Sequence, residues 1–215
     1  MFSITLKSFL SAVIAAMLIS TARAAIVFES ALPGGGGESG ITLGDGSSQI
    51  YGAAFTISQG VHVDSIGGLM FAVGAPFSDD IFGAIVRLSS VDAVPTGNPF
   101  AGADVAASTV FHVGSTSSHE VTTPLSVDLD PGAYAIVFGN NQFGATGAAG
   151  APPAGAVLTT HYLVWNTNSG GWKTGTGYSR FVVNGTTVPE PSTSLLLVVA
   201  TGFLATFRGR LRKSK

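Results

Sequence analysis

The sequence contains no cysteine, and only 10% of its residues are charged. A fold without disulfides must be stable through its core alone, and a hydrophobic content of 46% is enough to build one. The low charge excludes a disordered polyelectrolyte. The chain also lacks the apolar spacing of an amphipathic helix in any window of about 12 residues. It is instead rich in turn formers, with 29 glycines and 10 prolines, which indicates a single loop-rich globular domain.

Basic residues are scarce between the two ends of the chain. Residues 25–190 contain three basic residues (Arg87, Lys173 and Arg180) and all twelve acidic residues, which gives a net charge of −9. Such an acidic domain repels the phosphate backbone, because nucleic-acid binding depends on clustered Lys and Arg. We therefore expect no nucleic-acid partner.

The N-terminus has the organisation of a secretory signal peptide. Lys7 precedes an apolar stretch over residues 9–19, and Ala22 and Ala24 follow with the spacing of a cleavage site. The apolar stretch is too short for a membrane span, which needs roughly 20 residues. We predict a signal peptide at 1–24, removed after Ala24, and export of the remaining chain.

The C-terminus combines an apolar run over residues 194–207 with a basic tail. As a helix, the run would cover about 21 Å, and snorkelling arginines would extend it toward the bilayer core of about 30 Å. A basic cluster after an apolar segment stops transfer and stays in the cytoplasm. We therefore expect a transient anchor in the inner membrane. The tail residues are Arg208, Arg210, Arg212, Lys213 and Lys215.

A stiff tetrapeptide, Val188, Pro189, Glu190 and Pro191, stands directly before this apolar run. Its prolines disfavour helix and hold the chain extended, which suits recognition by a protease, and the layout is that of a removable anchor. Residues 188–215 resemble the PEP-CTERM sorting signal. The resemblance implies processing by an exosortase in Gram-negative bacteria that make extracellular polysaccharide, and a final place at the cell surface or in the matrix. The alternative is an anchor that is never cut.

The region at 25–187 consists of short β-type runs separated by turn residues. Several runs alternate apolar and polar residues, as 119–129 does, which is typical of antiparallel strands with one buried face. We expect an all-β fold, an antiparallel β-sandwich with jelly-roll-like connections, and a barrel as the alternative. The expected strands are 26–30, 49–57, 61–73, 81–88, 108–113, 119–129, 132–139, 159–166 and 179–185.

Within this region, the segment "LDPGAY" predicts a turn followed by a strand in which Tyr134 is a core or corner residue. Together with "FGATG", "HYLVW" and "RFVVNG", it resembles domains found in PEP-CTERM proteins, which implies an all-β surface domain without an assigned activity. Two low-complexity segments, 32–40 and 144–156, are expected to be a flexible linker and a long mobile loop.

Motifs for catalysis and metal binding are missing. No G-x-S-x-G elbow occurs, and His62, His112, His119 and His161 are scattered over different expected strands. His112 and His119 would meet across a hairpin, yet two ligands make no metal site. We therefore expect no catalytic residue, no cofactor and no enzymatic activity.

Acidic residues give one weak hint of calcium. The loop "LGDGSSQ", with Asp45, has a suitable composition but lacks the spacing of an EF-hand. Asp79 and Asp80 are adjacent, so "FSDD" reads as a turn.

Aromatic residues give the best hint of binding. Tyr162, Trp165, Trp172 and Tyr178 surround the polar hairpin "NTNSGGWKTGTG", where an exposed ring would stack on a sugar. The alternative is that these rings pack into the core.

The sequence thus predicts an exported surface or matrix protein with a structural or adhesive role. The alternative is a carbohydrate- or calcium-binding module with extracellular polysaccharide as partner. Less favoured is a polysaccharide hydrolase, which would need two carboxylates about 5 to 9 Å apart in a groove.

Overall fold

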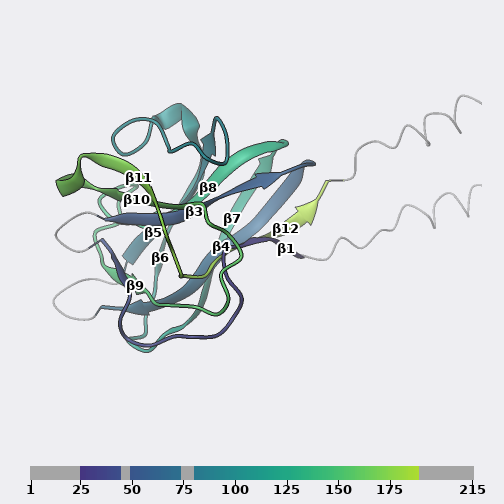
Figure 1. The fold of residues 1–215 in the computed structure, drawn as a ribbon. Coiled ribbons are helices and arrows are strands. Elements are labelled where there is room, and N and C mark those ends of the chain that lie inside the picture. The colour runs from purple at the N-terminus through teal and green to yellow at the C-terminus, as the bar shows by residue number, and fades with distance from the viewer. Residues whose placement is uncertain (1–24, 45–48, 74–79, 189–215) are drawn as a thin grey trace, which may run out of the picture.

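The computed structural model describes residues 25–44, 49–73 and 80–188, and these form an all-β fold (Figure 1). Within these ranges there are twelve strands and two short 3-10 turns, and no helix is long and apolar enough to cross a membrane. The strands are β1 (Ala25–Glu29), β2 (Ile41–Leu43), β3 (Ile50–Ile57), β4 (Val61–Ala72), β5 (Asp80–Leu88), β6 (Val105–His112), β7 (His119–Leu129), β8 (Gly132–Gly139), β9 (Ala149–Ala151), β10 (Tyr162–Asn166), β11 (Gly171–Gly175) and β12 (Phe181–Thr187).

Several predictions fall outside the described ranges. These are the signal peptide at 1–24 with Ala22 and Ala24, the motif residues Pro189 to Pro191, the apolar run at 194–207, and the basic tail. Val188 is described, and its amide donates to the carbonyl of Gly60 at 2.8 Å.

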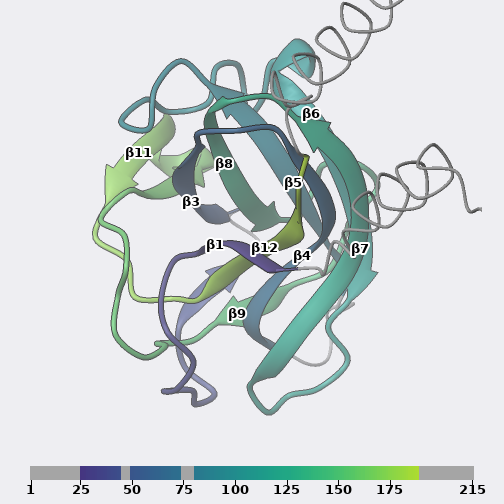
Figure 2. The same ribbon diagram turned by 90° about the vertical axis from the view of Figure 1, so that its right-hand side faces the viewer.

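The strands form two six-stranded sheets in which every pair is antiparallel. In the first sheet the order is β1-β12-β4-β9-β2, with β7 also paired to β4. In the second sheet the order is β11-β10-β3-β8-β5-β6. The two sheets have separate strand orders and share one core, which is consistent with the expected β-sandwich. Figure 2 shows β3, β8 and β5 on one side of the core and β1, β12 and β4 on the other.

The main core lies between the sheets and follows from the alternation of the strands. In β7, Val121, Leu125 and Leu129 point inward and are buried, while Thr122 and Ser126 face solvent. Tyr134 is 1% exposed, and its hydroxyl donates to the carbonyl of Asp130 at 2.9 Å. The prediction of a core or corner role for Tyr134 is confirmed.

The second sheet is buried on both faces. Its central strands β3, β5 and β8 have almost no polar position, because one set of side chains faces the other sheet and the alternate set forms a second cluster. In β5, Ile81 and Ile85 belong to the first set, while Phe82 belongs to the second. Residues outside the central strands cover the second cluster, and these include Val91, Phe100 and Trp172 on β11. Because both faces of β3, β5 and β8 are covered, an exposed site on this sheet can form only at the covering residues or at the sheet edges.

All nine expected strands are present, although some bounds shift by a few residues. Three further strands, β2, β9 and β11, were not among those expected. The prediction of a mobile loop at 144–156 is wrong, because this segment contains β9. All residues of β9 are buried, and the strand pairs with β2 and β4. Small residues are required there since the strand packs closely.

The flexible linker expected at 32–40 is also wrong in part. The amide of Leu32 donates to the carbonyl of Ala156 at 2.9 Å, and that of Gly36 donates to Pro153 at 2.8 Å. The segment is thus tied to a distant part of the chain. The predicted turn at "FSDD" also needs correction, because Asp80 begins β5, while Asp79 lies outside the described residues.

Candidate binding site

The four aromatic residues that suggested a ligand platform do not share one surface. Tyr162 and Trp165 are both on β10 but three positions apart, so their side chains point to opposite faces of the sheet. Tyr162 is 0% exposed in the main core, where its hydroxyl donates to the carbonyl of Ser179 at 2.8 Å. Burial raises the pKa of this hydroxyl. Tyr162 is therefore a core residue, as the alternative interpretation held.

Tyr178 is also separate from the tryptophans. Its side chain is 44% exposed, but no ring contact joins it to Trp165 or Trp172 within the described part of the chain. Its carbonyl accepts from the amide of Ala154 at 2.7 Å, which places it over the segment after β9. Tyr178 is consequently an isolated aromatic residue on the surface.

Trp172 belongs to an aromatic cluster that the sequence did not reveal. Its ring lies 5.5 Å from that of Phe100, and Phe100 stacks on Phe143 at 6.2 Å between centroids. Both phenylalanines make edge contacts with the buried ring of Phe82, which anchors the cluster to β5. The Trp172 indole N–H donates to the carbonyl of Pro99 at 2.6 Å. Residues from three separate segments thus form one aromatic surface, named here the Phe100–Phe143–Trp172 surface.

Phe143 is the most exposed member of this surface. Its side chain is 42% exposed, and its backbone has φ = 53°, in the left-handed region that a bulky residue rarely adopts. Such backbone conformations are costly and cluster at ligand-binding positions. The fold therefore holds an apolar ring partly in solvent at an energetic cost.

A hollow of about 330 Å³ lies at the β10–β11 hairpin and includes Trp165 among its lining residues. The side chain of Trp165 is 6% exposed, and its cross-strand partner on β11 is Trp172. Its buried indole N–H has no hydrogen-bond partner in the described residues. A buried donor without a partner costs roughly 1 to 3 kcal/mol, and each such group in a native protein calls for an explanation.

The rest of the hollow is polar and made of main chain. Asn98 and Thr167 line it, together with Gly97, Gly170 and Gly171. Gly170 ends the 3-10 turn at 167–169 with φ = 76°, which favours glycine. A tryptophan beside an amide, a hydroxyl and open main chain is a suitable lining for a neutral ligand with many hydroxyl groups.

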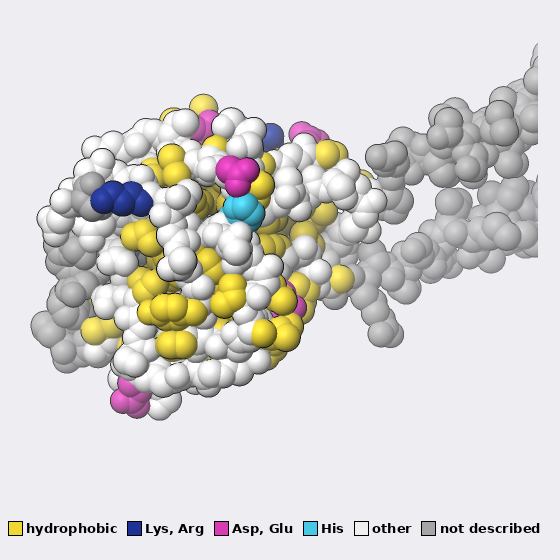
Figure 3. Space-filling view, viewed as in Figure 1, with side chains coloured by type: hydrophobic (Ala, Val, Ile, Leu, Met, Phe, Trp, Pro, Cys, Tyr) yellow, Lys and Arg dark blue, Asp and Glu magenta, His cyan; other side chains and the backbone are white. Residues whose placement is uncertain are grey.

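Charged side chains are sparse on one face of the domain. In the face shown in Figure 3, uncharged and hydrophobic side chains cover most of the area. The basic side chain nearest in sequence to the Trp172 ring is its neighbour Lys173, which is exposed. A ligand here would be recognised by stacking and neutral hydrogen bonds more than by charge.

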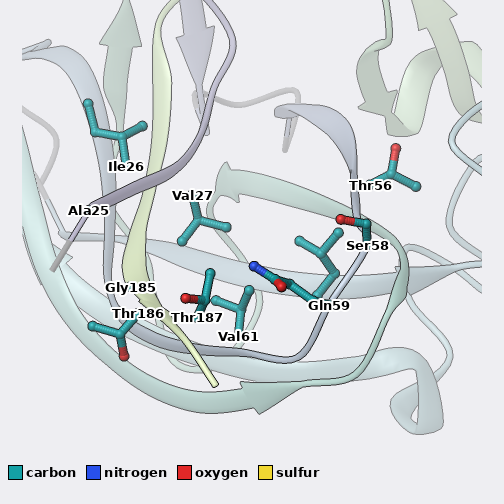
Figure 4. A pocket seen from close by; sticks show the side chains of 11 residues that line it. Ala25, Ile26, Val27, Thr56, Ser58, Gln59, Val61, Gly185, Thr186 and Thr187 are labelled. Atoms are coloured by element: carbon teal, nitrogen blue, oxygen red, sulfur yellow. The ribbon is translucent and has the colours of Figure 1, made fainter. Parts of the chain in front are cut away.

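A second hollow of about 290 Å³ opens at the end of the sandwich beside β1 and β12 (Figure 4). Val27, Gln59 and Thr187 point toward its middle, while Thr56 on β3 and Ser58 in the β3–β4 turn also line it. It contains no ring and no charged side chain, so it offers less for recognition than the Phe100–Phe143–Trp172 surface.

The histidines do not gather into a metal site. In the described residues no group of three or more His, Cys, Asp or Glu side chains is placed to hold a metal ion. His112 Nδ1 lies 3.1 Å from Asp80, while His119 donates to the carbonyl of Ser117 at 3.0 Å. The hairpin across which His112 and His119 could have met does not form, because β6 pairs with β5 and β7 pairs with β4. Asp45, in the loop proposed for calcium, lies outside the described ranges.

His62 is in a more elaborate setting. Its Nδ1 lies 2.6 Å from Asp128 Oδ1, and Asp64 is 3.7 Å from its Nε2. The hydrogen bond to Asp128 is the largest of the effects that raise the pKa of His62. These residues lie on the solvent face of the first sheet, whereas the aromatic cluster packs on the second sheet.

Comparison with known proteins gives no family assignment. No protein-family model matches the chain, and no curated protein matches it. The argument for a function therefore rests on the chain's own residues.

Sequence reasoning found Trp165 and Trp172 but missed Phe100 and Phe143. A weak signal was available, because "NPF" at 98–100 and "QFG" at 142–144 each place one phenylalanine among turn residues. A lone apolar residue in a turn predicts a loop anchor, but nothing in the sequence indicates that the two anchors meet.

Proposed function

We propose that this chain is an exported protein of the cell surface or extracellular matrix, where it has an adhesive or structural role by binding polysaccharide. The sequence supports export through its N-terminal signal and its C-terminal resemblance to a PEP-CTERM signal. An exosortase would process it near Val188 after a transient stay in the inner membrane. The acidic, cysteine-free domain would then be released or displayed.

The observation that carries the binding proposal is the exposed, backbone-strained Phe143 stacked on Phe100 beside Trp172. Aromatic faces pack against the C–H face of sugar rings, and a surface of several rings presents such faces without any charged group. The adjoining hollow supplies Asn98, Thr167 and the unpaired N–H of Trp165 for hydroxyl groups. The partner is therefore an uncharged or weakly acidic polysaccharide.

We also infer jelly-roll-like connections for the sandwich. Support comes from the neighbours β1-β12-β4-β7 in one sheet and β3-β8-β5-β6 in the other, because successive strands then cross between the sheets as in two Greek keys. The β10–β11 hairpin is an addition beside β3. This addition carries both tryptophans of the proposed site, while Phe100 and Phe143 come from other segments.

Binding is tested by titrating the purified full-length protein in detergent with the extracellular polysaccharide of the producing cell, by calorimetry, with calcium and with chelator. Trp172→Ala and Phe143→Ala are expected to weaken binding about tenfold or more, because truncating a central aromatic anchor costs roughly 2 kcal/mol. Tyr178→Ala is the matched control, since this ring is equally exposed but isolated. Equal affinity in all four proteins would refute the proposed site.

Export and processing need a separate test. Mass spectrometry of the protein recovered from the cell surface or medium should find an N-terminus at Ala25 and a C-terminus at or near Val188. Recovery of the intact chain in the inner membrane would instead support an uncut anchor.

A further inference from the structure

The solvent face of the first sheet brings together a serine, a histidine and an aspartate that the sequence shows as separate residues. His62 on β4 is directly opposite Asp128 on β7 in the antiparallel ladder, and Ser126 is two residues away from Asp128 on the same strand. Residues directly opposite and diagonal in a ladder are neighbours on one face. The register therefore places Ser126 and Asp128 on either side of the same imidazole.

The distances assign a different role to each ring nitrogen. Nδ1 of His62 lies 2.6 Å from Oδ1 of Asp128, whereas Nε2 lies 3.4 Å from Oγ of Ser126 and 3.7 Å from Oδ1 of Asp64. In the neutral imidazole, Nδ1–H donates to the carboxylate, which leaves Nε2 as the acceptor for the serine hydroxyl. This is the order of nucleophile, base and orienting acid that activates serine in hydrolases of unrelated folds.

We propose that Ser126, His62 and Asp128 form a triad that makes Ser126 a nucleophile toward acyl esters. Ser126 and His62 would act on the reacting atoms, and Asp128 is a positioning residue. This activity goes beyond polysaccharide binding and does not depend on it, because the Phe100–Phe143–Trp172 surface belongs to the other sheet.

The local backbone suits this role. Val63 is opposite Val127 and Ser65 is opposite Pro124, so the ladder changes register at Leu125 and Ser126. Such irregularities leave a main-chain amide outside the ladder and are frequent beside active sites. An amide left free beside Ser126 by this irregularity would be the type of donor that stabilises the oxyanion of a tetrahedral intermediate.

The reaction balances without a cofactor. Ser126 Oγ bonds to the carbonyl carbon of the ester while its proton passes to His62 Nε2. Collapse of the intermediate breaks the bond to the alcohol, which leaves with that proton. Water then attacks the acyl-serine by the same route and releases the carboxylic acid, which restores the Ser126 hydroxyl and the neutral imidazole.

The open position of the triad limits its substrates. Ser126 is exposed on a sheet face, so no pocket wall selects the alcohol part of the ester. An ester carried on a polymer therefore reaches Ser126 as easily as a small ester does. The class of substrate is therefore a small acyl group esterified to an accessible alcohol.

The first test uses the full-length protein and a fluorophosphonate probe, followed by peptide mass spectrometry. We expect one phosphonylated serine, Ser126, in the wild-type protein. Labelling that is absent, or that falls on other serines equally, overturns the proposal without any variant having to fold.

The second test measures hydrolysis of p-nitrophenyl acetate. Ser126→Ala and His62→Ala are expected to lower the rate about 100-fold, which is within the usual contribution of a general base, while Thr122→Ala on the same strand face leaves it unchanged. An unchanged rate in Ser126→Ala with a native melting curve refutes the triad. Trp172→Ala should hydrolyse the ester normally, so failure of polysaccharide binding and failure of this activity are distinguishable.

The role of Asp128 is tested by the pH profile. Because its hydrogen bond raises the pKa of His62, Asp128→Asn is expected to move the inflection of the rate to lower pH as well as lowering the rate. A lower rate with an unmoved inflection would assign Asp128 a merely structural role and contradict the proposed relay.

Discussion

Phe71 on β4 lies directly opposite Gly150 on β9, and its ring covers the glycine. A Cβ built at position 150 would overlap the atoms of that ring. The pair explains why β9 consists of small residues, because Phe71 takes the space on this side of the strand. It also explains why a segment that reads as low complexity becomes part of a sheet.

We predict that Gly150→Ala destabilises the protein by about 1 to 3 kcal/mol, as expected for overpacking. Urea unfolding of the full-length protein measures the change. Gly102→Ala is the matched control, because a Cβ there meets nothing within 4 Å. In a Phe71→Ala background the Gly150→Ala substitution should cost much less, and a full cost in that background would show that the ring is not the cause.

Arg180, directly before β12, forms ion pairs with residues of two other strands. Its Nη1 lies 2.7 Å from Glu120 on β7 and its Nη2 lies 2.9 Å from Glu29 on β1, while its own side chain is 7% exposed. We predict that Arg180→Met lowers the free energy of unfolding by about 2 kcal/mol, below the usual cost of breaking a fully buried pair, because water reaches Glu120.

Chemical denaturation checks this prediction, with the exposed Lys173→Met as control. Adding Glu29→Gln and Glu120→Gln to Arg180→Met should restore part of the loss, because no unpaired carboxylate then remains. If the triple variant were less stable than Arg180→Met alone, the loss would have to come from packing of the arginine stem.

The backbone at Phe143 predicts different stabilities for two small substitutions. Its φ of 53° costs a bulky residue about 1 to 2 kcal/mol that glycine avoids. Both Phe143→Gly and Phe143→Ala lose the ring contacts with Phe82 and Phe100. The difference between their free energies of unfolding therefore measures the cost of the backbone conformation. Thermal unfolding should find the glycine variant more stable than the alanine variant by about 1 kcal/mol. Equal stabilities would mean that the loop relaxes to another conformation.

The pairing of His62 with Asp128 predicts a pH dependence. The carboxylate raises the pKa of His62 above its ordinary value, so the folded protein binds this proton more tightly than the unfolded chain. The pair therefore stabilises the fold at pH below the unfolded pKa of histidine, and this contribution is lost as pH rises through the folded pKa.

An NMR titration of the His62 ring measures the effect directly. Asp128→Asn should lower the His62 pKa, whereas Asp104→Asn, on the 3-10 turn at 102–104, should leave it unchanged. A His62 pKa that stays the same in Asp128→Asn would show that the pair is not formed in solution.

Much of the architecture was predictable from local chemistry. Period-two alternation in β7 and apolar runs in β3, β5 and β8 mark the strands, because a strand has one or two buried faces and its side chains alternate between them. The same rule places Tyr162 and Trp165 on opposite faces, so the four-residue aromatic platform was already inconsistent with β10 being a strand.

The sequence by itself determined the all-β class, nine of the strands, the core role of Tyr134 and the acidic character of the domain, since each depends on residues near one another in the chain. The tertiary structure alone decided which strands are neighbours and in what register. That decision brings Phe100 and Phe143 to Trp172, and Ser126 and Asp128 to His62. Such groups are invisible in one sequence because cross-strand contacts are set by packing of the whole sandwich, and a shift of one residue would turn each side chain to the other face.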